Sequence, residues 1–234
     1  MLASVFFAGG NPFLAGIFVI IVLLLSVAIT LLVSSILGTT ILKGVDSSFT
    51  LELPPYRKPQ FAKVIVRSMM DRTIFVLGRA ICVSVPAGAF IWLLQNVMVE
   101  DMTLLGMVSY FLEPLGNVMG LSGAILAAFL LGIPANEIVI PILLMYYSQS
   151  GMLVETSGIA ELGEILQNNG WTVVTAACAI LFSLNHFPCA TTLWTVAKET
   201  KSVKWTIVSF LLPTIIGVTL CMIVNFGGKI LLGM

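Results

Sequence analysis

Side chains that can bind a metal ion gather at two places where a hydrophobic segment is interrupted. Cys189 and His186, the only histidine of the chain, lie three positions apart and flank Pro188. Glu137 lies at the other interruption and supplies a carboxylate. Thiolate, imidazole and carboxylate suit a first-row transition-metal ion. Amide and hydroxyl oxygens extend the candidate pathway set, which is Cys189, His186, Glu137, Asn185, Asn136, Thr191 and Thr192.

Each principal candidate also has a purely structural interpretation, which the sequence leaves open. Cys189 can be a small buried apolar residue, as free cysteines often are. His186 can close a broken helix through a hydrogen bond, and Glu137 can be a favourable charge at the start of a helix. An ionisable group inside a membrane segment is nevertheless a functional candidate.

Two interrupted helices must position these residues. Segment 171–198 breaks at 185–189, and the largely apolar run of 14 residues before this break extends about 21 Å, less than the ~30 Å hydrocarbon core. Segment 121–147 is interrupted in the same way at 132–137. Opened backbone at membrane depth is tolerated only against protein or a watery cavity, so paired interruptions indicate a transporter's binding site. The helix-breaking residues are Gly132, Pro134 and Pro188.

The composition supports a membrane protein and excludes several other classes. The chain is 59% hydrophobic and 9% charged, and its mean hydropathy is +1.09. Its net charge of zero gives no electrostatic basis for binding nucleic acid. The four cysteines show no paired spacing, which argues against a disulfide framework or a zinc ribbon. No phosphate-binding loop of the G-x-x-x-x-G-K-[ST] type is present, so we expect no GTP binding and no enzymatic activity.

The predicted fold is all-α, a polytopic membrane protein with about six transmembrane segments, two of them broken helices. Residues 1–42 form the end of an upstream helix and a first span. Residues 43–73 are rich in Lys and Arg and form a cytoplasmic loop with an amphipathic helix on the lipid surface. Residues 74–234 form the transport domain with the two breaks. Segment 104–115 is short. If it is re-entrant, every later loop lies on the opposite side of the membrane from the one predicted.

Several motifs resemble the membrane half of the bacterial ferrous iron transport protein B (FeoB) family. Residues 132–139, G-I-P-A-N-E-I-V, resemble its G-x-x-A-K-E-V-V gate motif. Residues 187–193, F-P-C-A-T-T-L, resemble its V-P-C-x-A-T-L motif. Asn136 stands where the family usually has lysine, so a charge pair with Glu137 is lost. The most specific match is the E-L-P-P-Y-R signature, formed by Glu52, Leu53, Pro54, Pro55, Tyr56 and Arg57.

The resemblance covers the whole chain and implies the permease part of a ferrous iron transporter in a bacterial inner membrane. Fe²⁺ is then the substrate, with no permanently bound cofactor. The family's G domain and first gate have no counterpart in this sequence. We therefore expect a separate polypeptide of the same transporter to supply them, and lipid to be the other partner.

Two other functions remain open from the sequence. A nucleoside-type or other small-solute permease is possible, because its gate repeats resemble these. Such a protein should place aromatic and amide residues around the breaks and has no need of a thiol. The second is an inactive fragment or an assembly subunit of a split transporter.

Overall fold

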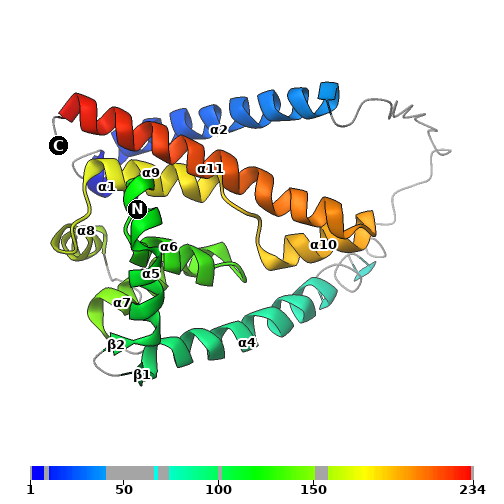
Figure 1. Cartoon of the computed structure of the whole chain (residues 1–234), viewed down its shortest axis with the longest axis horizontal. Coiled ribbons are helices and arrows are strands. Elements are labelled where there is room, and N and C mark those ends of the chain that lie inside the picture. The colour runs from blue at the N-terminus through cyan, green and yellow to red at the C-terminus, as the bar shows by residue number, and fades with distance from the viewer. Residues whose placement is uncertain are drawn as a thin grey trace.

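The computed structural model describes residues 2–7, 11–40, 66–67, 74–99, 102–150 and 158–232. In these ranges the chain is almost entirely helical, which confirms the all-α class (Figure 1). The strands there are the two-residue β1 (Met98–Val99) and β2 (Met102–Thr103), which pair antiparallel. The E-L-P-P-Y-R signature at 52–57 and almost all of the predicted cytoplasmic loop lie outside the described residues.

Three helices begin behind a hydroxyl side chain that accepts a hydrogen bond from the first turn, namely Thr103, Ser122 and Thr172. In chain order the elements are α1 (Leu2–Phe6), α2 (Pro12–Thr40), α4 (Phe75–Asn96), α5 (Leu104–Met119), α6 (Gly123–Leu131), the 3₁₀ turn η2 (Asn136–Ile138), α7 (Val139–Ser148), α8 (Ile159–Asn168), α9 (Val173–Asn185), α10 (Ala190–Thr200) and α11 (Val203–Leu232). From α8 to α11 the helices follow one another with connections of two to four residues.

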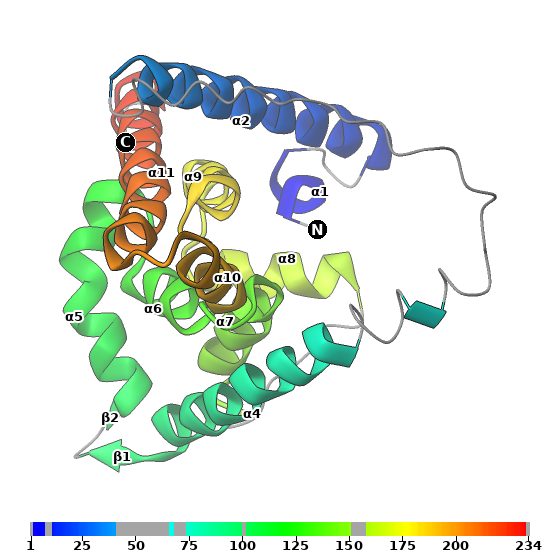
Figure 2. The ribbon, with the colours of Figure 1, turned by 90° about the vertical axis from the view of Figure 1, so that its right-hand side faces the viewer.

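The buried core lies where α5, α6, α7 and α9 meet. α9 packs along α11 on one side and contacts α1 and α2 on another (Figure 2). Ile125, Ile142 and Cys178 are almost completely buried in this core. This packing encloses the ends of α6 and α9, where the predicted breaks lie.

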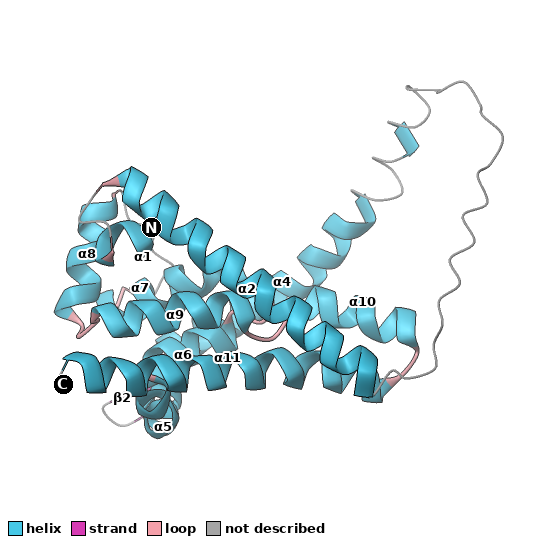
Figure 3. Ribbon diagram, turned by 90° about the horizontal axis from the view of Figure 1, so that it is seen from above, coloured by secondary structure: helices cyan, strands magenta, loops and turns pink. Residues whose placement is uncertain are grey.

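The two longest helices present apolar side chains to the outside instead. α2 and α11 run past the shorter helices (Figure 3). On α2, Phe13 is 74% exposed and Leu24 is 64% exposed. Apolar residues over so long an exposed helix suit contact with lipid.

Among the described residues, fewer helices are long and apolar enough to cross a membrane than the sequence suggested. Three stretches are long and apolar enough to cross: 13–40, 173–200, which includes the break, and 203–230. The pair α5 and α6 makes a fourth if it counts as one span. The count of about six is therefore not confirmed among the described residues. α6 and α7 are each only about 15 Å long, so neither spans ~30 Å alone.

The short segment predicted at 104–115 is part of a longer bent unit. α5 continues to Met119, and α6 leaves it at an angle of 108°. Gly123 allows this close crossing, because a Cβ there would lie 2.8 Å from Glu113 N and would also collide with Ser109 O. The bend fits either a broken span or a re-entrant loop.

Candidate functional site at the two helix breaks

The first break separates α6 from α7. α6 ends at Leu131, and residues 132–135 leave helical geometry before η2 begins. Pro134 explains the break, because it has no N–H to donate and its ring clashes with the preceding turn. Gly132 closes α6 through a 2.8 Å hydrogen bond from its N–H to Ala128 O. A side chain at Gly132 would meet Val139 Cγ2 at 2.6 Å, so the turn needs glycine.

The second break separates α9 from α10. α9 ends at Asn185, and α10 begins at Ala190. Pro188 lies between them and prevents a continuous helix. Cys189 is the N-cap residue of α10, with φ −62° and ψ 159°. The thiol therefore lies at the start of a helix whose first N–H groups have no partner within the helix.

The two breaks touch each other through the backbone. Ala190 N–H, the first of α10, donates to Ile133 O at 2.8 Å. The carbonyl is left open by the first break and the N–H by the second, so each satisfies the other. Phe129 of α6 adds a ring contact to His186, with centroids 5.3 Å apart. The structure thus brings Cys189 and His186 of one break next to the backbone of the other.

The Cys189 thiol lies in a small polar cluster. Its Sγ is 3.1 Å from Thr191 Oγ1 and 3.1 Å from Thr192 Oγ1. The side chain is partly exposed, unlike Cys178 and Cys221, which are fully buried. Cys189 is therefore the cysteine of this pair of helices that an ion or reagent can reach.

His186 is held in the tautomer that suits a metal ligand. Its Nδ1 lies 2.9 Å from Ser183 O, and because a carbonyl only accepts, Nδ1 carries the proton. Nε2 then keeps its lone pair, and it is buried without a hydrogen-bond partner among the described residues. The imidazole is 8% exposed and packs against the rings of Phe182 and Phe187. A buried, unpaired acceptor of this kind calls for a bound donor or a cation.

Asn185 ties the second break to α2. Its Oδ1 accepts a hydrogen bond from Ser26 Oγ at 3.2 Å, and its Nδ2 donates to Leu181 O at 3.0 Å. Asn185 and His186 also line a pocket of about 350 Å³ between α2, α9 and α11. Pro213 of α11 lies on its other wall. His186 therefore borders this pocket, while its Nε2 is itself buried.

The remaining candidates are not gathered into a closed site. Glu137 and Asn136 are both exposed on η2. Within the described part of the chain, no group of three or more His, Cys, Asp or Glu side chains could hold a metal ion. Any ion at the breaks therefore has two or fewer such ligands in this conformation, together with hydroxyl, amide, backbone or water oxygens.

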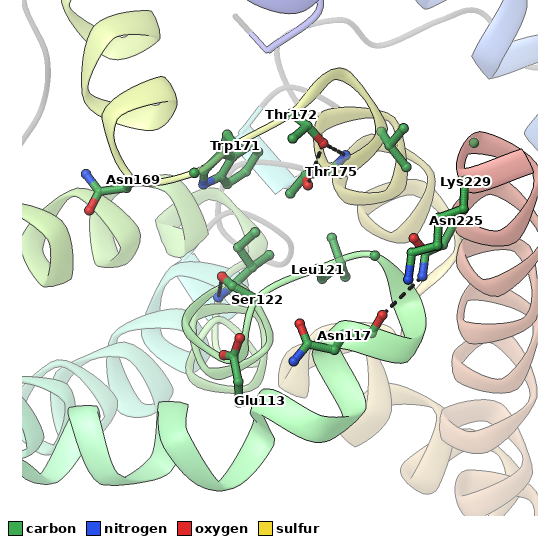
Figure 4. Close-up of a pocket in the computed structure, with 15 residues that line it drawn as sticks. Glu113, Asn117, Leu121, Ser122, Asn169, Trp171, Thr172, Thr175, Asn225 and Lys229 are labelled. Carbon is green, nitrogen blue, oxygen red and sulfur yellow. Dashed lines mark hydrogen bonds between the residues drawn. The ribbon is translucent and has the colours of Figure 1, made fainter. Parts of the chain in front are cut away.

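Sequence reasoning missed the polar pocket at the α5–α6 bend. It measures about 320 Å³, and its wall includes Glu113 and Lys229 (Figure 4). Glu113 Oε2 accepts from Gly123 N–H at 2.6 Å, so the carboxylate holds the start of α6. Asn225 donates to Asn117 O at 3.1 Å and also to Val118 O. The local signal of this bend in the sequence was Gly120, because a glycine at a helix end often takes the left-handed conformation that it has here.

Comparison with known proteins places the chain among membrane gate segments. The family model described as "Gate: Nucleoside recognition" matches residues 12–203. A protein named Fe(2+) transporter FeoB from Staphylococcus aureus (strain MSSA476) is 30% identical over 201 residues. That match covers 82% of this chain and 28% of the relative. The FeoB proteins of Synechocystis and Methanocaldococcus jannaschii are 29% and 23% identical, over 71% and 92% of this chain and 26% and 33% of theirs.

These relatives are much longer than this chain. The chain spans about 28% of the first of them. No solved structure matches it.

Proposed function

The chain belongs to the Gate family, and from this premise we propose that it carries Fe²⁺ across a bacterial inner membrane as the permease part of a FeoB-like transporter. The similarity to FeoB proteins supports a membrane role in such a transporter.

The observation that carries the proposal is the contact between the two breaks. A hydrogen bond from Ala190 N to Ile133 O closes the breaks against each other, with Cys189 beside it. An ion that replaces this contact would meet the thiol and the freed Ile133 carbonyl together. Transporter sites are commonly built in this way, where unwound carbonyls and half-helix ends face the ion.

The donor set fits a ferrous ion better than a harder cation. Fe²⁺ accepts imidazole nitrogen and thiolate sulfur, while Mg²⁺ and Ca²⁺ prefer oxygen. His186 offers the Nε2 lone pair, and Cys189 offers sulfur once its proton leaves. Thr191 contributes a hydroxyl within 3.1 Å of that sulfur. A sparse set of this kind suits transport, because an ion that crosses must also leave.

Glu137 and Asn136 supply a second step on the same path. Both are exposed on η2, directly after the first break. Glu137 adds a negative charge that attracts the cation, and Asn136 replaces the lysine usual in the family. The charge of Glu137 is therefore not neutralised by its chain neighbour, which should favour capture of a divalent ion.

Energy for transport has to come from outside the residues described here. The sequence contains no phosphate-binding loop, so we propose that a G-domain and first-gate polypeptide of the same transporter binds GTP and joins this chain. No permanently bound cofactor is needed for the proposed passage of Fe²⁺.

The test is uptake of radioactive ferrous iron into liposomes that contain this chain and the partner polypeptide. Cys189→Ser should lower the initial rate about tenfold or more, because a soft ligand is lost. Cys178→Ser is the matched control, since this buried cysteine lies on α9 away from solvent. Equal losses from the two variants would remove Cys189 from the pathway. Full uptake by this chain without the partner would contradict the need for a second polypeptide.

A nucleoside or similar small solute is the second candidate cargo. The observation in its favour is the set of rings around His186, from Phe129, Phe182 and Phe187, with the Asn185 amide beside them. Rings and amides are the groups expected at the breaks of such a permease. Uptake of labelled uridine in the same liposomes, insensitive to Cys189→Ser, would favour this cargo. Uptake of neither solute, with the partner present, would favour an inactive fragment or an assembly subunit.

A further inference from the structure

The polar pocket at the α5–α6 bend carries an acid and a base that do not pair with each other. Glu113 and Lys229 both line its volume of about 320 Å³. Figure 4 shows Glu113 with Asn117 on α5, and Lys229 with Asn225 on α11. In the described part of the chain, neither charged side chain makes an ion pair. Opposite charges that line one pocket without a counter-charge point to a ligand that carries both.

The acidic end of the pocket offers acceptors. One oxygen of the Glu113 carboxylate accepts from Gly123 N–H at 2.6 Å, which leaves the other oxygen for a ligand. Asn225 is 3% exposed, and its Nδ2 donates to Asn117 O and Val118 O, which fixes the orientation of the amide. Its Oδ1 keeps accessible surface and has no hydrogen-bond partner among the described residues. An ammonium group supplies the donors that these two oxygens lack.

The basic end of the pocket offers donors. Lys229 lies where α11 packs against the start of α9, since a Cβ at the neighbouring Gly228 would be 2.8 Å from Val174 Cγ2. The first N–H groups of α9 have no partner within the helix. Thr172 and Thr175 share one hydroxyl hydrogen between Oγ1 atoms 3.0 Å apart, so the other hydroxyl hydrogen is free to be donated. A carboxylate would accept from these donors and pair with Lys229.

We propose that this pocket binds a small amino acid in its zwitterionic form. The ammonium group lies between Glu113 and Asn225, and the carboxylate lies between Lys229 and the start of α9. Leu121 and Val174 are apolar members of the lining and give a short side chain its contacts. The volume is at the small end of the range for ligand pockets, which suits a solute such as alanine.

A ligand with a single charge fits this pocket less well. A simple cation is attracted by Glu113 and repelled by Lys229, and for a simple anion the two signs are reversed. A zwitterion places each of its charges against the opposite one. None of the lining residues belongs to either helix break, so this binding is separate from the passage of Fe²⁺ proposed above.

The probe is radiolabelled alanine, measured by equilibrium dialysis against the purified chain in detergent. The wild type should bind it saturably, and Lys229→Gln should weaken binding about tenfold or more, because a charged hydrogen bond is lost at an exposed position. Glu113→Gln keeps an acceptor for Gly123 N–H and should weaken binding by a similar factor. Lys204→Gln is the matched control, because this exposed lysine lies at the other end of α11 and outside the lining, and it should change nothing.

A charge reversal tests the assignment of the two ends. Lys229→Glu should abolish binding of alanine and create binding of 1,3-diaminopropane, which carries two ammonium groups. Acetate and methylamine each carry one of the two charges and should bind the wild type at least about tenfold more weakly than alanine. Binding of either as tight as that of alanine would overturn the proposal, since the site would then recognise a single charge. Absence of saturable alanine binding, or equal affinity of the wild type and Lys229→Gln, would overturn it too.

Discussion

Ala190→Pro would remove the hydrogen bond between the two breaks and push them apart. Ala190 is the first residue of α10, where proline fits because the N–H has no partner within the helix. The residue before a proline must be extended, and Cys189 already is, with φ −62° and ψ 159°. The substitution therefore leaves α10 intact, deletes the N–H that donates to Ile133 O at 2.8 Å and puts the proline Cδ in front of that oxygen, which must move away.

The size of the effect follows from that bond. An unpaired carbonyl costs about 1–3 kcal/mol, and the lower end applies because Ile133 and Ala190 are only partly buried. Proline restricts the unfolded chain and offsets about 0.4–1 kcal/mol of this in global unfolding. Local opening of the breaks gains no such offset. A change of about 1 kcal/mol should raise the open population roughly fivefold.

The measurement is the alkylation rate of Cys189 by a small maleimide, in a background where the exposed Cys82 is serine. This rate should rise at least about fivefold in Ala190→Pro, because the lost bond and the displaced Ile133 carbonyl both favour the open form. Val173→Pro is the matched control, at the first position of α9 behind the extended Thr172. An unchanged Cys189 rate in Ala190→Pro, or an equal rise in the control, would refute the idea that the bond holds the breaks closed.

Three further predictions address packing, ligation and topology. Gly123→Ala should lower the free energy of unfolding by about 3 kcal/mol, because the added methyl group overpacks the crossing and the hydrogen bond to the Glu113 carboxylate is lost. Gly88→Ala is the control and should not lower it, because a Cβ there has nothing within 4 Å. Equal denaturation midpoints for the two variants would contradict the close α5–α6 crossing. His186→Asn should reduce Fe²⁺ uptake about tenfold or more by removing Nε2, and full uptake would show that the ring is structural. A cysteine at Ser47 should be labelled only from the cytoplasmic side and one at Ser157 only from outside; labelling of both from one side would mean that the bent α5–α6 pair does not cross.

The membrane class and the positions of the breaks follow from local chemistry. Proline lacks an N–H and crowds the preceding turn, so Pro134 and Pro188 favour helix ends where they stand. The structure accordingly leaves helical geometry at 132–135 and 186–189. Pro86, Pro114 and Pro213 lie inside continuous helices, so proline alone does not decide where a helix ends. The E-L-P-P-Y-R signature, together with the motifs at both breaks, carried the resemblance to the FeoB family, which the comparisons bear out. The roles of Cys189, His186 and Glu137 remain predictions.

The number of crossings could not be obtained from hydropathy. α5 and α6 are both apolar, and the same composition suits a straight span, a broken span or a re-entrant loop. The 108° angle between the helices excludes the straight span and fits the other two cases. That angle depends on the close approach of Gly123 to the backbone of α5 and on Asn225, more than 100 residues away, which binds the end of α5.

Only the tertiary structure decided which unpaired groups meet. Every interrupted helix leaves open carbonyls and N–H groups, and the sequence shows where these arise but not how they pair. Ile133 O meets Ala190 N, and Ser26 reaches Asn185 across 159 positions. The same holds for Glu113 and Lys229, which line one pocket although no spacing rule connects them. Pairing between distant segments depends on how the helices pack, and short-range patterns carry no information about it.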